Sequence, residues 1–104
     1  MIPDKIKYMG ITYRVREGKI GRDEDGQKYL GRLFWGKTEI RLRKNSSEQG
    51  KMRTLVHEIM HIILGERFES GTDPERLIAI LSSGFVHILQ ENPELYEYIK
   101  EMEE

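Results

Sequence analysis

The hydrophobic pattern changes its period near residue 45, and this change constrains the fold more than any other feature of the chain. Before it, apolar and polar residues alternate as in half-buried strands, at residues 6–9 and 11–16 around Gly10. After it, apolar residues recur with a helical period. The sequence therefore predicts one α+β domain spanning residues 1–104, strand-rich over 1–44 and helical over 46–104.

A second pair of strands is predicted at residues 29–35 and 38–42, turning at Gly36-Lys37. Residues 18–28 carry several Gly and Asp residues and are expected to form a turn. We expect a small, twisted antiparallel or mixed sheet of three to four strands with one covered face. The basic strand at residues 37–43 is expected to lie at its edge.

The helical half contains clear start and stop signals. A first helix is expected from Ser46 or Ser47 to about Leu64, ended by Gly65. A second begins with Asp73 as N-cap and runs to about residue 91. A short third helix follows at residues 94–102. The sheet is expected to pack on these helices.

Composition excludes several classes of protein. The 104 residues contain no cysteine, so thiol nucleophiles, iron–sulfur clusters and cysteine-based zinc sites are ruled out. Seventeen Lys and Arg residues against 18 Asp and Glu give a net charge of −1, which argues against nucleic acid as a partner. No apolar run approaches a membrane span, and we expect a soluble cytoplasmic protein without a membrane partner.

The first helix carries the sequence His57-Glu58-Ile59-Met60-His61. Helical residues advance by about 100° each, so His61 lies about 40° round from His57 and both imidazoles can bind one Zn²⁺ ion. Glu58 lies about 100° from His57, where it can reach a water in the site. We interpret His57 and His61 as zinc ligands and Glu58 as the general base.

The rest of this helix supports that interpretation, because its apolar residues avoid the side of the histidines. They cluster between about 140° and 260° from His57. The members of this apolar stripe are Leu55, Val56, Ile59, Ile62 and Ile63.

A catalytic zinc site normally has three protein ligands and one open position. The metzincin pattern is excluded because its glycine and histidine positions hold Leu64 and Arg67 here. The remaining candidates for the third ligand are Glu66, Glu69, Asp73, Glu75 and His87.

Glu75 is the preferred third ligand. The helix face that it shares is made of the small residues Ala79, Ser82 and Ser83, which allow another helix to approach. Two alternatives stay open: Glu75 as a first-turn acid favoured by the helix dipole, and Asp73 as a simple N-cap.

The order of these features resembles the small zinc peptidases related to ImmA/IrrE, which include phage-associated members and minimal gluzincins. The His57-Glu58-x-x-His61 motif within residues 54–61 is the specific part of the resemblance, and Gly10-Ile11-Thr12-Tyr13 and Asn92-Pro93-Glu94-Leu95 match its general order. The resemblance implies a zincin-like fold, with a glutamate from the second helix, here Glu75, as third zinc ligand. It also implies an extended polypeptide substrate lying along an edge strand, such as a regulatory protein cleaved at limited sites.

The sequence thus predicts a zinc metalloendopeptidase with Zn²⁺ as its cofactor. The alternative is a regulatory or protein-interaction module that keeps the fold, and even the metal, without catalysing hydrolysis. The sequence does not indicate an oligomeric state.

Overall fold

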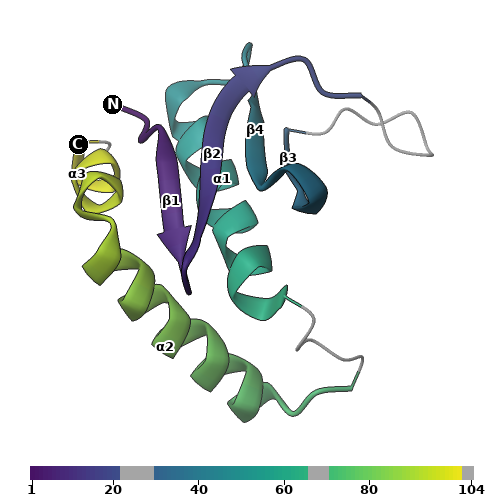
Figure 1. The fold of residues 1–104 in the computed structure, drawn as a ribbon, viewed down its shortest axis with the longest axis vertical. Helices are drawn as coiled ribbons and strands as arrows, with labels where there is room; N and C mark the ends of the chain where they lie inside the picture. The colour runs from purple at the N-terminus through teal and green to yellow at the C-terminus, as the bar shows by residue number, and fades with distance from the viewer. Residues whose placement is uncertain (22–29, 66–70, 102–104) are drawn as a thin grey trace.

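The computed structural model describes residues 1–21, 30–65 and 71–101. Over these residues it has an α+β fold with a four-stranded mixed sheet and three helices, which confirms the predicted α+β class with a small sheet (Figure 1). The elements are β1 (Lys5–Tyr8), β2 (Ile11–Gly18), β3 (Gly31–Phe34), the 3₁₀ turn η1 (Trp35–Lys37), β4 (Glu39–Arg43), α1 (Glu48–Leu64), α2 (Pro74–Glu91) and α3 (Pro93–Glu101).

Strands β1 and β2 form the first predicted hairpin. Tyr8 pairs with Ile11 across a two-residue turn at Met9 and Gly10, both of which have positive φ. Two successive positive φ values are typical of the tight turns whose twist matches paired strands. Most of the expected turn between β2 and β3 lies at residues 22–29, outside the described residues.

The sheet order is β1-β2-β4-β3, and this order corrects one expectation. Strand β4 pairs in parallel with β2 and antiparallel with β3, so it is an inner strand. The prediction that the basic strand at residues 37–43 lies at the edge is wrong. Inner and edge strands show the same alternation of apolar and polar residues when one face of the sheet is exposed to solvent. The charged residues of this strand lie on the exposed face of the sheet, and their charge does not indicate an edge strand.

Helix α1 covers one face of the sheet, behind β2 and β4 in Figure 1. Its buried apolar residues meet the inward side chains of the strands, of which Ile6, Ile40 and Leu42 are fully buried. The helix begins after Ser47, whose hydroxyl accepts a hydrogen bond from the Gly50 N–H at 3.0 Å, and it ends at Gly65. Both limits confirm the prediction. Lys51 ties the helix to β2 through an ion pair with Glu17 at 2.5 Å.

Asn92 covers the free edge of β1 where α2 ends. Its amide oxygen accepts from the Lys7 N–H at 2.8 Å, and its amide nitrogen donates to the Lys7 carbonyl at 2.9 Å and to the Ile88 carbonyl at 2.8 Å. The side chain is buried. One backbone position at this edge is therefore already satisfied in both directions.

Helix α2 packs against α1 at Gly84. A β-carbon at this position would lie 2.4 Å from the Ile63 Cγ2 atom, so only glycine allows this approach. Asp73 caps the helix by accepting from the Arg76 N–H, as predicted. No helix in the described parts of the chain is long and apolar enough to cross a membrane.

We expect Gly84→Ala to lower the free energy of unfolding by about 1–3 kcal/mol, because the new methyl group overpacks the contact with Ile63. Helix propensity alone would make the alanine variant more stable by about 1 kcal/mol. A fall in the free energy of unfolding therefore indicates overpacking against Ile63, and a rise indicates that propensity dominates. Urea denaturation measures this free energy. The exposed neighbour Ser83→Ala is the control, with an expected change within about 0.5 kcal/mol; an equal or greater stability of Gly84→Ala would contradict the close packing.

Candidate metal centre

His57 and His61 lie one turn apart on the solvent-exposed side of α1, opposite its buried stripe. Their Nε2 atoms are 3.2 Å apart, and the two rings meet edge to face with centroids 4.9 Å apart. Two ligands bound at 2.0–2.1 Å to a tetrahedral zinc are about 3.3 Å apart. The two ring nitrogens are therefore spaced as ligands of a single zinc ion.

Glu58 lies between the histidines and the core. It is 6% exposed, and a ligand atom of its carboxylate lies within 4.8 Å of those of both histidines. Among the residues that the structure describes, its Oε2 atom has no hydrogen-bond partner. Burial raises the pKa of the Glu58 carboxyl, while nearby His61 and His57 act in the opposite direction. A buried carboxylate with one unused oxygen beside the ligand pair can accept a proton from a water placed there.

The three side chains lie in a cleft between α1 and the outer strand β3. Gly31 brings the strand close to the helix, because a β-carbon there would lie 2.3 Å from the Thr54 Cγ2 atom. The cleft wall therefore depends on a strand glycine that sequence reasoning did not single out. The lining residues are Leu30, Gly31, Arg32, Arg53, Thr54, His57, Glu58 and His61.

Arg53 is a second cleft residue that sequence reasoning missed. It lies four residues before His57, the same spacing that separates the two histidines, so it shares their side of α1. That spacing was a signal available in the sequence. Arg53 thus lines the same cleft as the candidate ligands.

The structure does not bring Glu75 into the group formed by His57, Glu58 and His61. Glu75 is exposed on the first turn of α2. It is nine residues before Gly84, which puts it about 180° round the helix from the contact with α1. Of the other acidic candidates, Glu66 and Glu69 lie outside the described residues, and the Asp73 carboxylate caps α2.

His87 and the two tyrosines of α3, Tyr96 and Tyr98, are not among the residues that line the cleft with His57 and His61. The His87 ring packs edge to face on Tyr8, with centroids 5.6 Å apart, and its Nε2 atom lies 3.0 Å from a carboxylate oxygen of Glu91. Tyr98 is buried in the core, and Tyr96 is exposed on α3. These contacts give the three residues structural or surface positions.

Comparisons of the chain with protein-family models, with curated proteins and with solved structures found no significant match.

We expect His57→Ala and His61→Ala each to weaken zinc binding by more than about 100-fold. Removing a residue that only hydrogen-bonds to a zinc ligand weakens binding by about 10–100-fold, and removing the ligand itself costs more. Elemental analysis after dialysis against a competing chelator measures bound zinc. His87→Ala is the matched control, because that histidine lies outside the cluster. Equal zinc retention by all three variants would contradict the assignment.

Proposed function

We propose that the protein is a zinc-dependent metallopeptidase of gluzincin type, with the zincin-like fold that the resemblance to the ImmA/IrrE-related peptidases implies. The observation that carries the proposal is the 3.2 Å spacing of two imidazole Nε2 atoms beside a buried glutamate in an open cleft. This donor set suits zinc, since neutral imidazole and carboxylate are among its usual ligands.

In the proposed reaction, His57 and His61 hold the zinc ion. Bound zinc supplies Lewis acidity, which polarises a peptide carbonyl and lowers the pKa of a nearby water. Glu58 accepts a proton from the attacking water and passes it to the leaving amine as the peptide bond breaks. The buried position of Glu58 suits this role, because its Oε2 atom has no competing hydrogen-bond partner among the described residues and the carboxylate lies within reach of both histidines.

Arg53 is proposed to stabilise the developing negative charge on the carbonyl oxygen. It lies on the cleft wall one turn before His57, and a guanidinium there can donate hydrogen bonds to an oxyanion.

The substrate is proposed to bind as an extended strand beside β3. This strand has β4 as its neighbour on one side, and its other side borders the cleft. At the opposite edge of the sheet, Asn92 already satisfies the backbone of Lys7. Strand addition at β3 would hold a polypeptide close to the two histidines through main-chain hydrogen bonds.

A second candidate function is a metal-binding regulatory module without hydrolysis. It is favoured by one observation: in the described parts of the chain, only Glu58 joins the two histidines within 4.8 Å. If Glu58 were itself the third ligand, no general base would remain from this cluster.

We expect Glu58→Gln to retain zinc and lose hydrolysis, with a fall in kcat of about 100-fold or more, because the amide cannot accept the proton. The probe is a library of unmodified peptides incubated with zinc-loaded protein, with new termini counted by mass spectrometry. Gln90→Glu, an exposed change on α2, serves as the control for handling. Cleavage by Glu58→Gln at the parental rate would refute the base assignment, and loss of zinc would favour Glu58 as a ligand.

The third ligand is proposed to be a carboxylate that follows α1 in the chain. Glu75 is the residue indicated by the sequence and the resemblance, while Glu66 is five residues after His61. We expect one of Glu66→Gln, Glu69→Gln and Glu75→Gln to weaken zinc binding by at least about tenfold and the other two to leave it unchanged. Competition with a chromogenic chelator measures the affinities. Parental affinity in all three variants would exclude these ligands and favour the regulatory module.

A further inference from the structure

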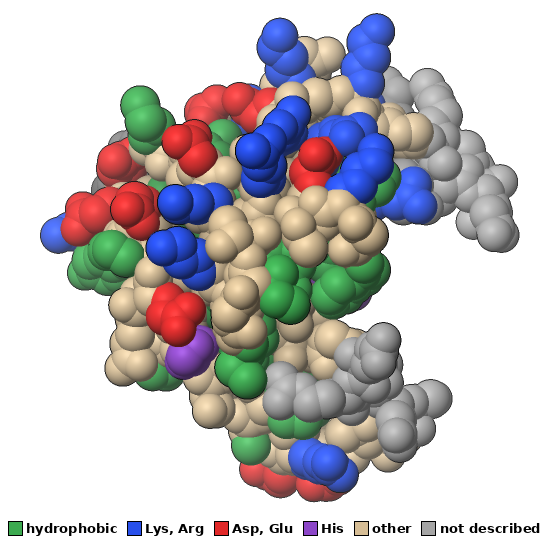
Figure 2. All heavy atoms as spheres, viewed as in Figure 1, with side chains coloured by type: hydrophobic (Ala, Val, Ile, Leu, Met, Phe, Trp, Pro, Cys, Tyr) green, Lys and Arg blue, Asp and Glu red, His purple; other side chains and the backbone are tan. Residues whose placement is uncertain are grey.

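The sheet face that is turned away from α1 carries an unusual concentration of positive charge. Figure 1 shows no helix in front of it, and Figure 2 shows Lys and Arg side chains gathered over its upper part. We call this surface the basic sheet face. Its charged members, from the strand registers, are Lys5, Lys7, Arg14, Arg16, Arg32, Arg41 and Arg43, together with the carboxylate of Glu39.

Three arginines on this face stand side by side on neighbouring strands. Arg41 of β4 pairs with Arg16 of β2 on one side and with Arg32 of β3 on the other. Like charges directly opposite each other destabilise a sheet. The arginine row is not required for the stability of the fold, since the sheet is stabilised by burial of its opposite face against α1.

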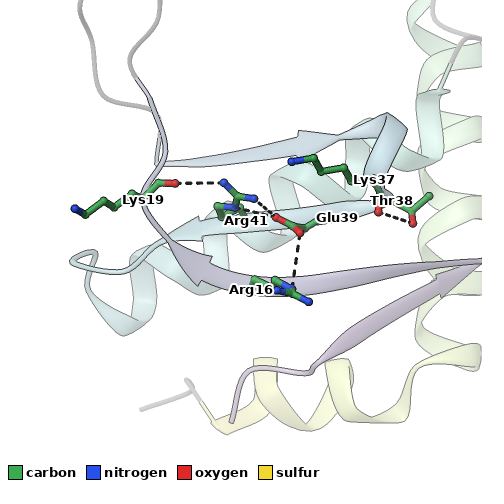
Figure 3. A network of polar contacts seen from close by, with 6 residues as sticks. All are labelled: Arg16, Lys19, Lys37, Thr38, Glu39 and Arg41. Atoms are coloured by element: carbon green, nitrogen blue, oxygen red, sulfur yellow. Dashed lines mark hydrogen bonds and ion pairs between the residues drawn. The ribbon is translucent and has the colours of Figure 1, made fainter.

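Glu39 partly offsets the repulsion. It is 8% exposed, accepts hydrogen bonds from Arg41 Nε at 2.8 Å and Nη2 at 2.6 Å, and lies 3.8 Å from Arg16 Nε (Figure 3). Arg41 Nη1 also lies 3.5 Å from the Lys19 carbonyl oxygen. These contacts hold Arg41 in the centre of the face, and on the described strands Glu39 is the carboxylate that faces these cations.

The Phe34 ring at the end of β3 lies close to three cations, of which Lys37 adds to the arginine row. The guanidinium carbon of Arg41 lies 4.7 Å from the ring centroid, that of Arg32 lies 5.2 Å away, and Lys37 Nζ lies 5.7 Å away. Each such contact is an attraction between a cation and the negative face of the aromatic ring. The ring therefore holds three positive groups together without neutralising any of them.

We propose that the basic sheet face is a docking surface for an acidic segment of a partner protein. An anionic partner is indicated by the row of arginines and by the excess of cations over carboxylates among the strand residues of the face that the structure describes. A short acidic polypeptide fits the extent of the charge, because the four strands span about 14 Å at about 4.8 Å per strand spacing.

The surroundings of the face favour a polypeptide over nucleic acid. Asp4, Glu91 and Glu94 line a hollow with Lys5 and Lys7, so carboxylates border the face on the β1 side. A duplex continuing past the patch would carry phosphates over these carboxylates.

Arg32 connects this face to the metal centre, since it belongs to the arginine row and also lines the cleft. The acidic segment is therefore inferred to belong to the substrate, a step that rests on the proposed function. Docking on the basic sheet face would then retain the substrate while another part of its chain lies beside β3.

The test measures binding separately from hydrolysis, in the Glu58→Gln background. The probe is a fluorescein-labelled 12-residue peptide of alternating Glu and Ser, followed by fluorescence anisotropy at 50 and 200 mM salt. Arg14→Gln/Arg16→Gln is expected to weaken binding about five- to tenfold, as for the loss of two exposed ion pairs. Binding is expected to weaken at the higher salt concentration. The matched control, Arg76→Gln/Lys100→Gln, makes the same change in net charge away from the face and is expected to bind within about twofold of its parent.

Equal weakening in both double variants, or no binding of the peptide, would overturn the proposal. Tighter binding of a 12-nucleotide single strand or a 12-base-pair duplex, abolished by Arg14→Gln/Arg16→Gln, would overturn the choice of a polypeptide. Circular dichroism checks that the variants fold. As a measurement that needs no variant, backbone amide shifts on adding the peptide are expected in β2, β4 and β3, and shifts confined to α2 and α3 would contradict the site. If the parental protein binds the acidic peptide but cleaves nothing in the library of unmodified peptides, the docking surface stands. Only the inference that the acidic segment belongs to a substrate is then rejected.

Discussion

The burial of one side of α1 against the sheet is the constraint on which the rest of the structure depends. Leu55, Ile59 and Ile63 are fully buried, so the helix has one rotation about its axis that satisfies its apolar stripe. That rotation turns His57 and His61 outward together. Glu58 falls at the boundary, where it is covered by the core but still reaches the histidines. The geometry of the candidate metal centre is thus set by packing on the other side of the helix.

Features encoded by neighbouring residues could be predicted from the sequence. Ser47, Gly65, Asp73 and Pro74 specify helix ends by satisfying or removing backbone hydrogen bonds locally, and the structure agrees at all four. The histidine pair depends on an i, i+4 spacing and was equally accessible. In each case the physical cause lies within about one helical turn of its effect.

Features that depend on distant pairing could not be predicted. The position of β4 between β2 and β3 follows from a parallel pairing in which Arg14 lies beside Glu39, and strand alternation is the same whether such a pairing forms or not. The orientation of Glu75 depends in turn on which side of α2 meets α1, which Gly84 decides through its contact with Ile63. The sequence places small residues on two sides of α2: Ala79, Ser82 and Ser83 on the side of Glu75, and Gly84 on the opposite side. Only the packing of the folded chain determines that the Gly84 side contacts α1.

The inner position of β4 also explains why the basic sheet face can exist. At an edge, the cations of β4 would have a neighbouring strand on one side only. In its inner position, β4 places Arg41 between Arg16 of β2 and Arg32 of β3. Glu39 is held between Arg41 and Arg16 at the cost of burying a carboxylate, and burial is tolerable because both of its oxygens face guanidinium groups. These contacts hold Arg41 and Glu39 in place before any partner binds. Rigidity lowers the entropy lost on binding, so a preformed cationic face suits recognition of a flexible acidic segment that must itself become ordered.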